Sequence, residues 1–414
     1  MEYKTYKLGT CFSLIENGAI IKQRKEAKGF PITRIETLSH GKFNRDKLGH
    51  ADIFDTTPYK RYILEDKDLI MSHINSRAFL GRTVLYRKKG NEQIIHGMNV
   101  LRIKTNEQFL DPVFASYLFK TSHFKKAIDS IRKDAINQSS INIFDICNIQ
   151  ISLPSITEQR KISHALQLID KKIETNHLIN DNLEAMAKQL YDYWFVQFDF
   201  PNEEGKPYKS SGGAMVWNEK LKREIPQGWN AANIFDELSV QYGFPFSTEL
   251  FTEEPTNIPV VRIRDILENS VSAYSTEETD DKYKLQKCDL LIGMDGNFHM
   301  NYWNDNVSYL NQRSVRLRAK SNSTVSIMQT KYDIAPYIKA KELRAKGSTV
   351  GHLSDKDLKE LFVLVSPNTD FRNKFDSILA EIIENCCEMV ELTKQRDELL
   401  PLLMNGQASV NYHL

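Results

Sequence analysis

The sequence lacks every common catalytic or cofactor-binding motif and any apolar run of membrane length. It contains no GxxxxGK[ST], GxGxxG, HExxH or GxSxG segment, and no Asn-Pro-Pro or Asp-Pro-Pro segment of the kind with which amino-methyltransferases grip an extruded base. No window approaches the ~20 apolar residues needed to cross a bilayer, and the first ten residues contain no apolar signal-peptide core. We therefore predict a chain with no catalytic residue and no cofactor of its own.

Cysteine is scarce and scattered. The five cysteines show no CxxC spacing, so neither a disulfide framework nor a zinc site is predicted. The ten histidines are also dispersed, and we predict no metal site. A reducing cytoplasm is the simplest compartment for such a chain.

The charge is balanced overall but unevenly distributed. The net charge is +1, yet residues 1–150 carry 25 Lys and Arg against 16 Asp and Glu, a net charge of +9. Residues 230–366 carry 16 against 19, a net charge of −3. Only the first segment has the positive charge typical of phosphate contact, and a solvated lysine-rich surface would explain it equally well.

The chain contains an internal repeat with an offset of 213 residues. It is clearest in two predicted amphipathic helices, roughly residues 157–195 and 370–405, whose core-type residues are spaced alternately by four and three. Nine positions keep this period without a gap in both copies: Ile162, Leu166, Ile169, Ile173, Asn176, Asn180, Leu183, Ala187 and Leu190, then Phe375, Leu379, Ile382, Cys386, Met389, Thr393, Arg396, Leu400 and Leu403. We predict a coiled-coil seam whose polar members select register, although two ordinary core helices would show a similar pattern.

The sequence also predicts where the two helices begin and end. Ser155 or Thr157 is the expected cap of the first helix, Pro401 should bend or fray the end of the second, and Gly406 should stop it.

Upstream of each helix the repeat continues with small gaps, as expected when framework strands match and loops differ. The pairs of matching segments are 31–35 with 259–263, 67–70 with 288–291, and 101–104 with 315–318, and alternating apolar residues predict half-buried strands at 149–153 and 361–365. Residues 198–229 are rich in Gly, Pro, Ser and charge and are predicted to be a linker. The predicted divisions are 1–154 and 230–366 for two mixed α/β domains, 155–197 and 367–406 for the long helices, 198–229 for the linker and 407–414 for a tail.

Polar loops follow the framework strands in both copies. Arg, Asn and Gln can make bidentate contacts with guanine and adenine, and Asp can accept from cytosine, so these loops are candidate base readers, with plain surface loops as the alternative. The candidate DNA-binding residues are Ser72, Asn75, Arg77, Asn137, Gln138, Ser139, Asp295, Asn297, His299, Ser348, Thr349 and His352. Aromatic residues cluster near the end of the first helix, where Tyr191, Trp194 and Phe195 are predicted to dock a partner or, equally, to pack locally.

The whole chain resembles a specificity subunit of a type I restriction-modification enzyme. The residues that carry the resemblance are LPSITEQRKI at 153–162, AMAKQLYDYWFVQFDFP at 185–201, IPQGW at 225–229 and the closing RDELLPLLMNGQASV. The resemblance implies an α+β fold with two target-recognition domains joined by two long antiparallel coiled-coil helices in a pseudo-twofold duplication. It also implies double-stranded DNA and two modification (methyltransferase) subunits as partners, with restriction (ATP-dependent nuclease) subunits joining through the complex. The partners would supply adenine methylation and cleavage.

Because the two copies carry unlike loops, we expect a bipartite, asymmetric DNA target. A helix of about 40 residues spans ~60 Å, enough to set two readers about one DNA turn, ~34 Å, apart. The acidic second copy departs from this scheme, so its acidic runs must face away from phosphate or its half-site must rely on partner subunits. The rival interpretation is a coiled-coil scaffold with two protein-binding α/β modules.

Overall fold

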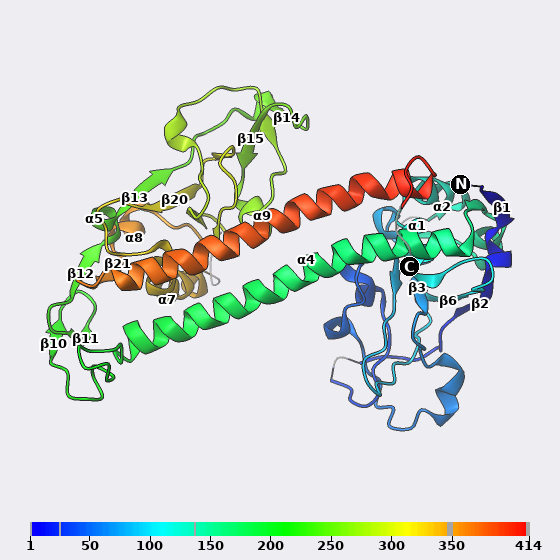
Figure 1. The fold of residues 1–414 in the computed structure, drawn as a ribbon, viewed down its shortest axis with the longest axis horizontal. Coiled ribbons are helices and arrows are strands. Elements are labelled where there is room, and N and C mark those ends of the chain that lie inside the picture. The colour runs from blue at the N-terminus through cyan, green and yellow to red at the C-terminus, as the bar shows by residue number, and fades with distance from the viewer. Residues whose placement is uncertain (1, 25, 136–137, 346–350, 411–414) are drawn as a thin grey trace. The chain divides into compact units, whose positions relative to one another are not determined.

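The structure is a computed structural model that describes residues 2–24, 26–135, 138–345 and 351–410. The chain forms two compact units (Figure 1). Unit 1 consists of Met1–Lys171 and Thr393–Leu414, and unit 2 is Lys172–Leu392. Each unit therefore contains one predicted α/β domain together with part of both long helices. In the described residues, no helix is long and apolar enough to span a membrane.

The two long helices form as the apolar period predicts. Helix α4 is Ile156–Tyr191 and continues into a π-helical turn, η6, Asp192–Val196, while α9 is Asp370–Met404. All eighteen predicted seam residues are buried or half-buried, which confirms the seam.

The ends of the two long helices also have the predicted residues. The Ser155 hydroxyl accepts from the Glu158 amide as the predicted cap, and Gly406 ends α9 with φ +72°. The predicted fraying at Pro401 is wrong, because the Asn405 amide donates to the Pro401 carbonyl and the last turn stays closed.

Polar seam residues pair between the helices within each unit. In unit 2 the Asn180 amide donates to the Ile382 carbonyl at 3.1 Å and accepts from Asn385 at 2.9 Å. In unit 1 Arg396 donates to Asp170 at 2.9 Å. These bonds satisfy polar groups that would otherwise destabilise the seam. In unit 2 the helix segments run antiparallel, because Asn176 donates to Glu388 whereas Asn180 donates to Ile382.

The framework of unit 1 is a four-stranded antiparallel sheet in the order β2-β6-β3-β5. Its strands are Phe12–Asn17, Leu101–Thr105, Leu69–Met71 and Thr83–Leu85. A separate ladder joins β1, Lys4–Lys7, to β9, Gln150–Leu153, the strand that leads into α4. A small sheet contains β4, β8 and β7, which are Ile74–Asn75, Ser139–Ser140 and Lys133–Asp134. The short helices of unit 1 are α1 Pro112–Leu118, α2 Ser122–Ile131 and α3 Ile143–Asn148.

Unit 2 repeats this framework with the strand order β13-β20-β17-β18. These strands are Leu238–Tyr242, Ser314–Ala319, Leu290–Gly293 and Met300–Tyr302. The ladder of β12, Asn230–Asn233, with β21, Phe362–Val365, corresponds to β1 with β9, but β21 is covered on both faces rather than half-buried as predicted. A second sheet contains β14 Phe251–Thr252, β16 Tyr274–Ser275, β15 Ile258–Val261 and β19 Tyr309–Leu310, and the helices are α5 Ile234–Glu237, α6 Ile263–Glu268, α7 Ile327–Ala345 and α8 Asp355–Lys359.

Matching sequence segments have matching local geometry. Lys67 and Cys288 each precede a framework strand and each has a positive φ, +69° and +70°. The aspartate that follows each of them accepts from a backbone amide three residues earlier, at 2.7 Å in both copies. The duplication therefore extends to unusual backbone conformations that the sequence match alone does not reveal.

Two sequence-based expectations require correction. Residues 31–35 form isolated bridges rather than a strand and lead into a 3₁₀ turn at Ile35–Gly41, whereas the matching residues of unit 2 do form β15. The predicted linker at 198–229 contains an antiparallel hairpin of β10, Met215–Asn218, and β11, Arg223–Pro226. Its strands are too short for a period to be visible among many turn residues.

Candidate DNA interface

In each unit the structure brings together the two loops that contain the predicted base readers. In unit 1, β4 pairs with β8, so that Asn75 lies opposite Ser139. In unit 2, Asp295 forms an antiparallel bridge with His352. Loops that are far apart in the sequence thus form one polar surface in both copies, at the same place relative to the framework strands β3 and β17.

The surface in unit 1 uses several predicted readers as internal supports. Ser72 and Ser139 are only 1% and 7% exposed, which corrects their prediction as base contacts. Ser72 accepts from the Asn75 amide at 3.1 Å, and Ser139 donates to Asp134 at 2.6 Å. Asn75 also accepts from the Ser76 backbone amide at 2.8 Å, so both ends of its side chain are already bonded. Ser72 and Ser139 therefore position the loop, whereas the half-buried Asn75 stays a candidate base contact, because its amide has a second N–H donor.

Two predicted readers of unit 1 remain accessible. The Arg77 side chain is 72% exposed, with its Nε 3.8 Å from Asp129, and Gln138 is exposed immediately before β8. Asn137 lies outside the described residues. The neighbouring His73 is buried, which lowers the pKa of its imidazole and keeps the ring neutral at neutral pH.

The surface in unit 2 is a groove of about 440 Å³ lined by arginine, amide and histidine side chains. The predicted readers Asp295, Asn297 and His299 all line it, whereas Ser348 and Thr349 lie outside the described residues. His352 is next to the groove and its Nδ1 lies 2.6 Å from the Asp295 carboxylate. The other lining residues are Arg262, Ile263, Arg264, Asn311, Gln312 and Arg313.

Sequence reasoning missed the three arginines of this groove. Arg262 and Arg264 follow β15, and Arg313 immediately precedes β20. Arg262 is partly structural, since it bonds to Ser272 and Asp265, but the side chains of Arg264 and Arg313 are each 68% exposed. The available signal was their position beside segments that match between the two copies, because a strand framework can orient loop residues next to its strand ends.

Three of the acidic residues in the net negative segment of unit 2 have structural partners. Asp280 caps a 3₁₀ turn by accepting from the Lys282 amide at 2.8 Å, and Asp281 accepts from the Tyr309 hydroxyl at 2.9 Å. Glu277 accepts from the Ser247 amide at 2.8 Å. The net charge of −3 therefore coexists with a groove that contains three arginines.

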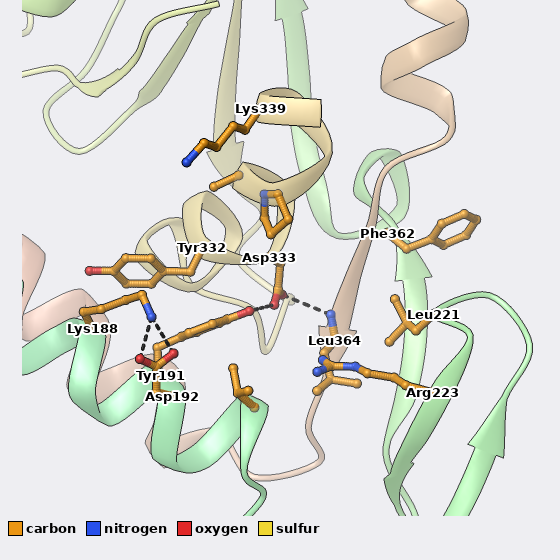
Figure 2. Close-up of a pocket in the computed structure, with 13 residues that line it drawn as sticks. Lys188, Tyr191, Asp192, Leu221, Arg223, Tyr332, Asp333, Lys339, Phe362 and Leu364 are labelled. Carbon is orange, nitrogen blue, oxygen red and sulfur yellow. Dashed lines mark hydrogen bonds and ion pairs between the residues drawn. The ribbon is translucent and has the colours of Figure 1, made fainter. Parts of the chain in front are cut away.

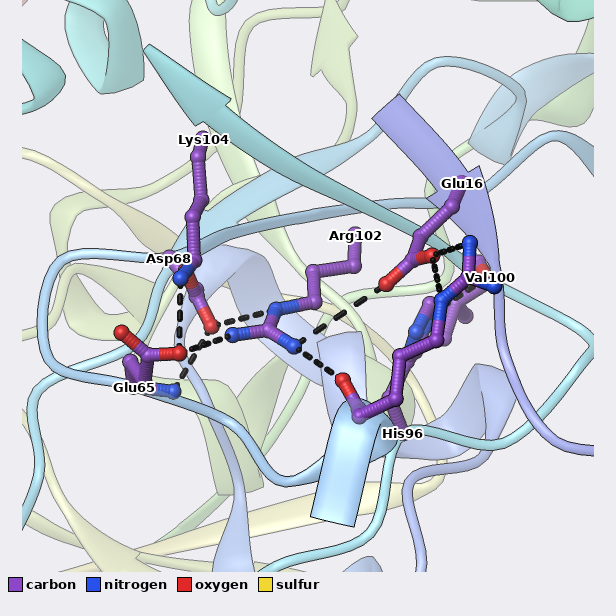
Figure 3. Close-up of polar contacts among 8 residues, drawn as sticks. Glu16, Glu65, Asp68, His96, Val100, Arg102 and Lys104 are labelled. Carbon is purple, nitrogen blue, oxygen red and sulfur yellow. Dashed lines mark hydrogen bonds and ion pairs between the residues drawn. The ribbon is translucent and has the colours of Figure 1, made fainter. Parts of the chain in front are cut away.

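A cluster of charged side chains around the buried Arg102 supports the sheet of unit 1 (Figure 3). The Arg102 guanidinium donates to Asp68 at 2.7 Å and to Glu65 at 3.2 Å, and it lies 4.0 Å from Glu16. Arg61 closes the cluster by donating to Glu16 at 2.7 Å. These contacts join β2 and β6 to the segment just before β3, the strand that leads into the loop of residues 72–77.

The corresponding cluster in unit 2 has fewer carboxylates. Arg316 takes the place of Arg102 in the strand register, and Gln241 stands opposite it where Glu16 stands in unit 1. Asp289 pairs with Arg318 at 2.7 Å, while Arg316 donates to backbone carbonyls and to Ser239. Burial lowers the pKa of Arg316. Unit 2 thus keeps the architecture of the cluster with a more positive set of side chains.

The aromatic residues at the end of α4 pack mainly into the core of unit 2. Trp194 is 4% exposed and its ring lies 4.8 Å from that of Phe371, and Phe195 is fully buried against Trp229. Tyr191 is also buried, and its hydroxyl donates to Asp333 at 2.7 Å. Local packing therefore accounts for Trp194 and Phe195, and a partner can reach only their neighbours.

Those neighbours surround a pocket of about 690 Å³ (Figure 2). Tyr191 from α4 and Leu364 from β21 meet Asp333 of α7 in the pocket. Burial raises the pKa of Asp333 to about 6, although hydrogen bonds from Tyr191, Leu364 and Gln329 oppose the shift. Lys188, Arg223 and Lys339 add positive charge to the lining, and Val196, which is 47% exposed, adds apolar surface.

Potential metal ligands and cysteines are dispersed over the described residues. No group of three or more His, Cys, Asp or Glu side chains there is arranged to hold a metal ion. The five cysteines are free, and burial raises the pKa of the Cys11 and Cys288 thiols to about 11.

Comparison with known proteins places these features in one family. The sequence profile described as "Type I restriction modification DNA specificity domain" matches residues 1–185 and 226–401. A putative type I restriction enzyme specificity subunit of Methanocaldococcus jannaschii, MjaX, is 32% identical over 236 residues, which are 57% of this chain and 52% of that protein. The MjaIX specificity subunit of the same organism is 27% identical over 310 residues, or 71% of this chain and 68% of that protein. The match thus spans about half the length of the first relative and two thirds of the second.

A solved structure has the same fold. The S subunit of a type I restriction-modification system from M. genitalium is 15% identical, with a TM-score of 0.56 over 97% of this chain and 96% of that one. The family profile matches the described framework strands of both units and most of both long helices. With its duplicated framework, its paired helices and its match over most of its length, this chain belongs to the type I restriction-modification DNA specificity family.

Proposed function

We propose that this chain reads a bipartite, asymmetric DNA target, with unit 1 recognising one half-site and unit 2 the other. The observation that carries the proposal is the same framework with unlike reading surfaces. In unit 1 the accessible groups are Arg77 and Gln138, whereas in unit 2 they are Asn297, Arg264 and Arg313. Different hydrogen-bonding groups on equivalent supports favour different base sequences.

The distribution of positive charge supports a different mode of DNA contact in the two units. Unit 1 has a general lysine and arginine surplus, with a net charge of +9 over residues 1–150, which suits contact with many phosphates. Unit 2 instead concentrates exposed arginine in its groove. We therefore assign unit 1 the larger share of the salt-dependent affinity.

We assign no chemical step of methylation or cleavage to this chain. Two modification subunits would supply the methyl-donor site, and restriction subunits would add ATP-driven cleavage through the complex. The chain contributes DNA sequence recognition and a surface on which these partners assemble.

The pocket at the end of α4 is the surface we assign to a modification subunit. It corresponds to the predicted docking region of Tyr191, Trp194 and Phe195, but the partner would contact the exposed Val196 and the cationic Lys188 and Lys339 instead. An apolar floor surrounded by charge suits an anchoring side chain of a partner.

The docking assignment is tested with Val196→Asp, which places a charge at the pocket. The matched control is Val307→Asp, since Val307 is 59% exposed in unit 2 and does not line the pocket. We expect the first variant to lose co-purification with the modification subunit and the control to retain it. Equal retention by both variants would remove the pocket from the docking surface.

The function itself is tested by co-expressing the chain with its modification subunit in a host without DNA methylation and mapping methylated bases. We expect one split motif with two different half-sites. Exchanging residues 230–366 for those of another family member should then change one half-site and leave the other intact. Absence of any sequence-dependent methylation, with a folded and assembled complex, would count against the proposal.

A further inference from the structure

One arginine of the unit 2 groove has an unusual backbone conformation. Arg313 has φ +62°, in the left-handed region that Gly, Asn and Asp accept more readily than a long side chain. Its carbonyl accepts from the Met294 amide at 2.9 Å, which fixes the turn against the end of β17. An arginine kept in such a conformation at a candidate interface points to a role for the side chain itself.

The Arg313 guanidinium is held by a carboxylate that is itself held. Its Nη1 donates to Asp295 Oδ2 at 3.0 Å, and the other oxygen of Asp295 lies 2.6 Å from His352 Nδ1. The Asp295 side chain is only 19% exposed, whereas those of Arg313 and His352 are 68% and 59% exposed. Each carboxylate oxygen of Asp295 therefore has one partner, and the carboxylate links Arg313 to His352.

The backbone on each side of Asp295 is pinned as well. The Gly296 amide donates to the Gly351 carbonyl at 2.9 Å, and the Leu353 amide donates to the Met294 carbonyl at 2.7 Å. These bonds fix the backbone that carries the carboxylate, and the carboxylate restrains the guanidinium through its Nη1. The result is a preorganised arginine, which binds with less loss of conformational entropy.

We propose that Arg313 reads a guanine in the half-site of unit 2, with Asp295 and His352 as positioning residues. This inference rests on the proposed function and makes it specific. In the described structure Asp295 bonds only Nη1, so Nη2 and Nε can donate together to guanine O6 and N7. Arg264 is equally exposed in the same groove but approaches Asp265 only at 4.0 Å, and it suits a phosphate contact that needs no fixed plane.

The test uses the assembled complex and the variant Arg313→Asn. Asparagine tolerates the left-handed backbone, as Asn269 of the same unit does with φ +49°. We expect the methylated motif to lose its guanine preference at one position of the second half-site, by roughly 10- to 100-fold, with the first half-site unchanged. Asp295→Asn should relax the same position to a smaller extent.

Arg264→Gln is the matched control. It removes an equally exposed arginine from the same groove, and it should reduce methylation evenly while every motif position is preserved. If Arg313→Asn behaves in that way, Arg313 contacts phosphate and the proposal is overturned. A motif unchanged in both base preference and extent of methylation would also overturn it.

A second measurement does not depend on the folding of a variant. Binding of the unmodified complex is measured on target duplexes in which each guanine of the second half-site is replaced in turn by 7-deazaguanine, which lacks the N7 acceptor. We expect one replacement to weaken binding several-fold, and insensitivity to every replacement would exclude the guanine contact. If the wild-type complex methylates no split motif, the proposed function itself is wrong. If the wild-type complex does methylate a split motif, the results above test the role of Arg313 alone.

Discussion

Arg102 and Asp68 form a buried ion pair at the centre of unit 1. The guanidinium Nε lies 2.7 Å from the carboxylate, and the side chains are 2% and 1% exposed. Burial raises the pKa of Asp68 in spite of this arginine, so removal from water outweighs the attraction of its partner. The pair therefore depends on both members being present.

We predict that Arg102→Met destabilises unit 1 by about 3–5 kcal/mol, because it leaves Asp68 buried without its cation. Hydrogen exchange of the β6 amides measures this free energy within unit 1. The comparison variant is Lys104→Met, since the Lys104 side chain is 31% exposed and bonds Glu65 near the surface. It should cost less than about 1 kcal/mol. Equal losses in the two variants would contradict the buried-pair argument.

Glu92 gives unit 1 a second, pH-dependent contribution. Hydrogen bonds from Arg45, at 2.9 Å from its Nε and 2.6 Å from its Nη2, lower the pKa of Glu92 to about 2. A carboxyl with a depressed folded pKa stabilises the fold above its unfolded value of about 4.5, and this stability is lost as the pH falls toward 2.

We predict that wild-type unit 1 loses more stability than Glu92→Gln as the pH falls from 5 to 3. Thermal unfolding at a series of pH values measures the difference. Arg45→Gln should flatten the dependence as well, since it removes the principal donor. Parallel pH profiles for wild type and Glu92→Gln would show that the bond contributes nothing.

The long helices were predictable because their signal is periodic and local. Eighteen seam positions at constant spacing specify two helices, and a buried asparagine such as Asn180 does not disturb that pattern. The framework strands were partly visible as matching segments. The pairing of β4 with β8 was not, because it joins residues 74–75 to residues 139–140 and depends on the tertiary structure between them.

The site residues were harder to predict because residue type does not reveal whether a polar group is already bonded. Ser72 and Ser139 look like surface residues in the sequence, yet both are buried supports. Arg313 looks like one more charge beside a strand, and only the three-dimensional structure shows its left-handed backbone and its contact with Asp295. Backbone conformation and hydrogen-bond satisfaction therefore separate supports from available contacts.

Asp333 should give unit 2 a pH dependence of opposite sign to that of Glu92. Its pKa is raised from 3.8 to about 6 by burial, so its contribution to stability is fully present below about pH 3.8 and is lost as the pH rises to about 6. We predict that wild type becomes less stable relative to Asp333→Asn over this interval, as measured by hydrogen exchange in α7.

Tyr191→Phe provides an independent check on Asp333. The Tyr191 hydroxyl donates to Asp333 and opposes the rise in its pKa, so its removal should shift the pH transition upward. A difference between wild type and Asp333→Asn that stays constant from pH 4 to 7 would mean that Asp333 does not titrate in this range.

The helix pair should set the spacing between the two half-sites of the target. Both helices pass from one unit to the other, α4 after Lys171 and α9 before Thr393. One heptad inserted at each of these points lengthens both helices and preserves the 3.5-residue period of the seam. Seven residues add about 10.5 Å, or about three base pairs of DNA. We predict a methylated motif with a correspondingly longer unspecified spacer and both half-sites unchanged.

A heptad inserted in α4 alone is the control for the spacing prediction. It would displace the seam pairs, including the bond of Asn180 to Ile382, and should abolish methylation rather than lengthen the spacer. If the double insertion leaves the spacer at its original length while both half-sites are still read, the helices do not set the distance between the half-sites. The spacing of the two half-sites would then have to come from the modification subunits.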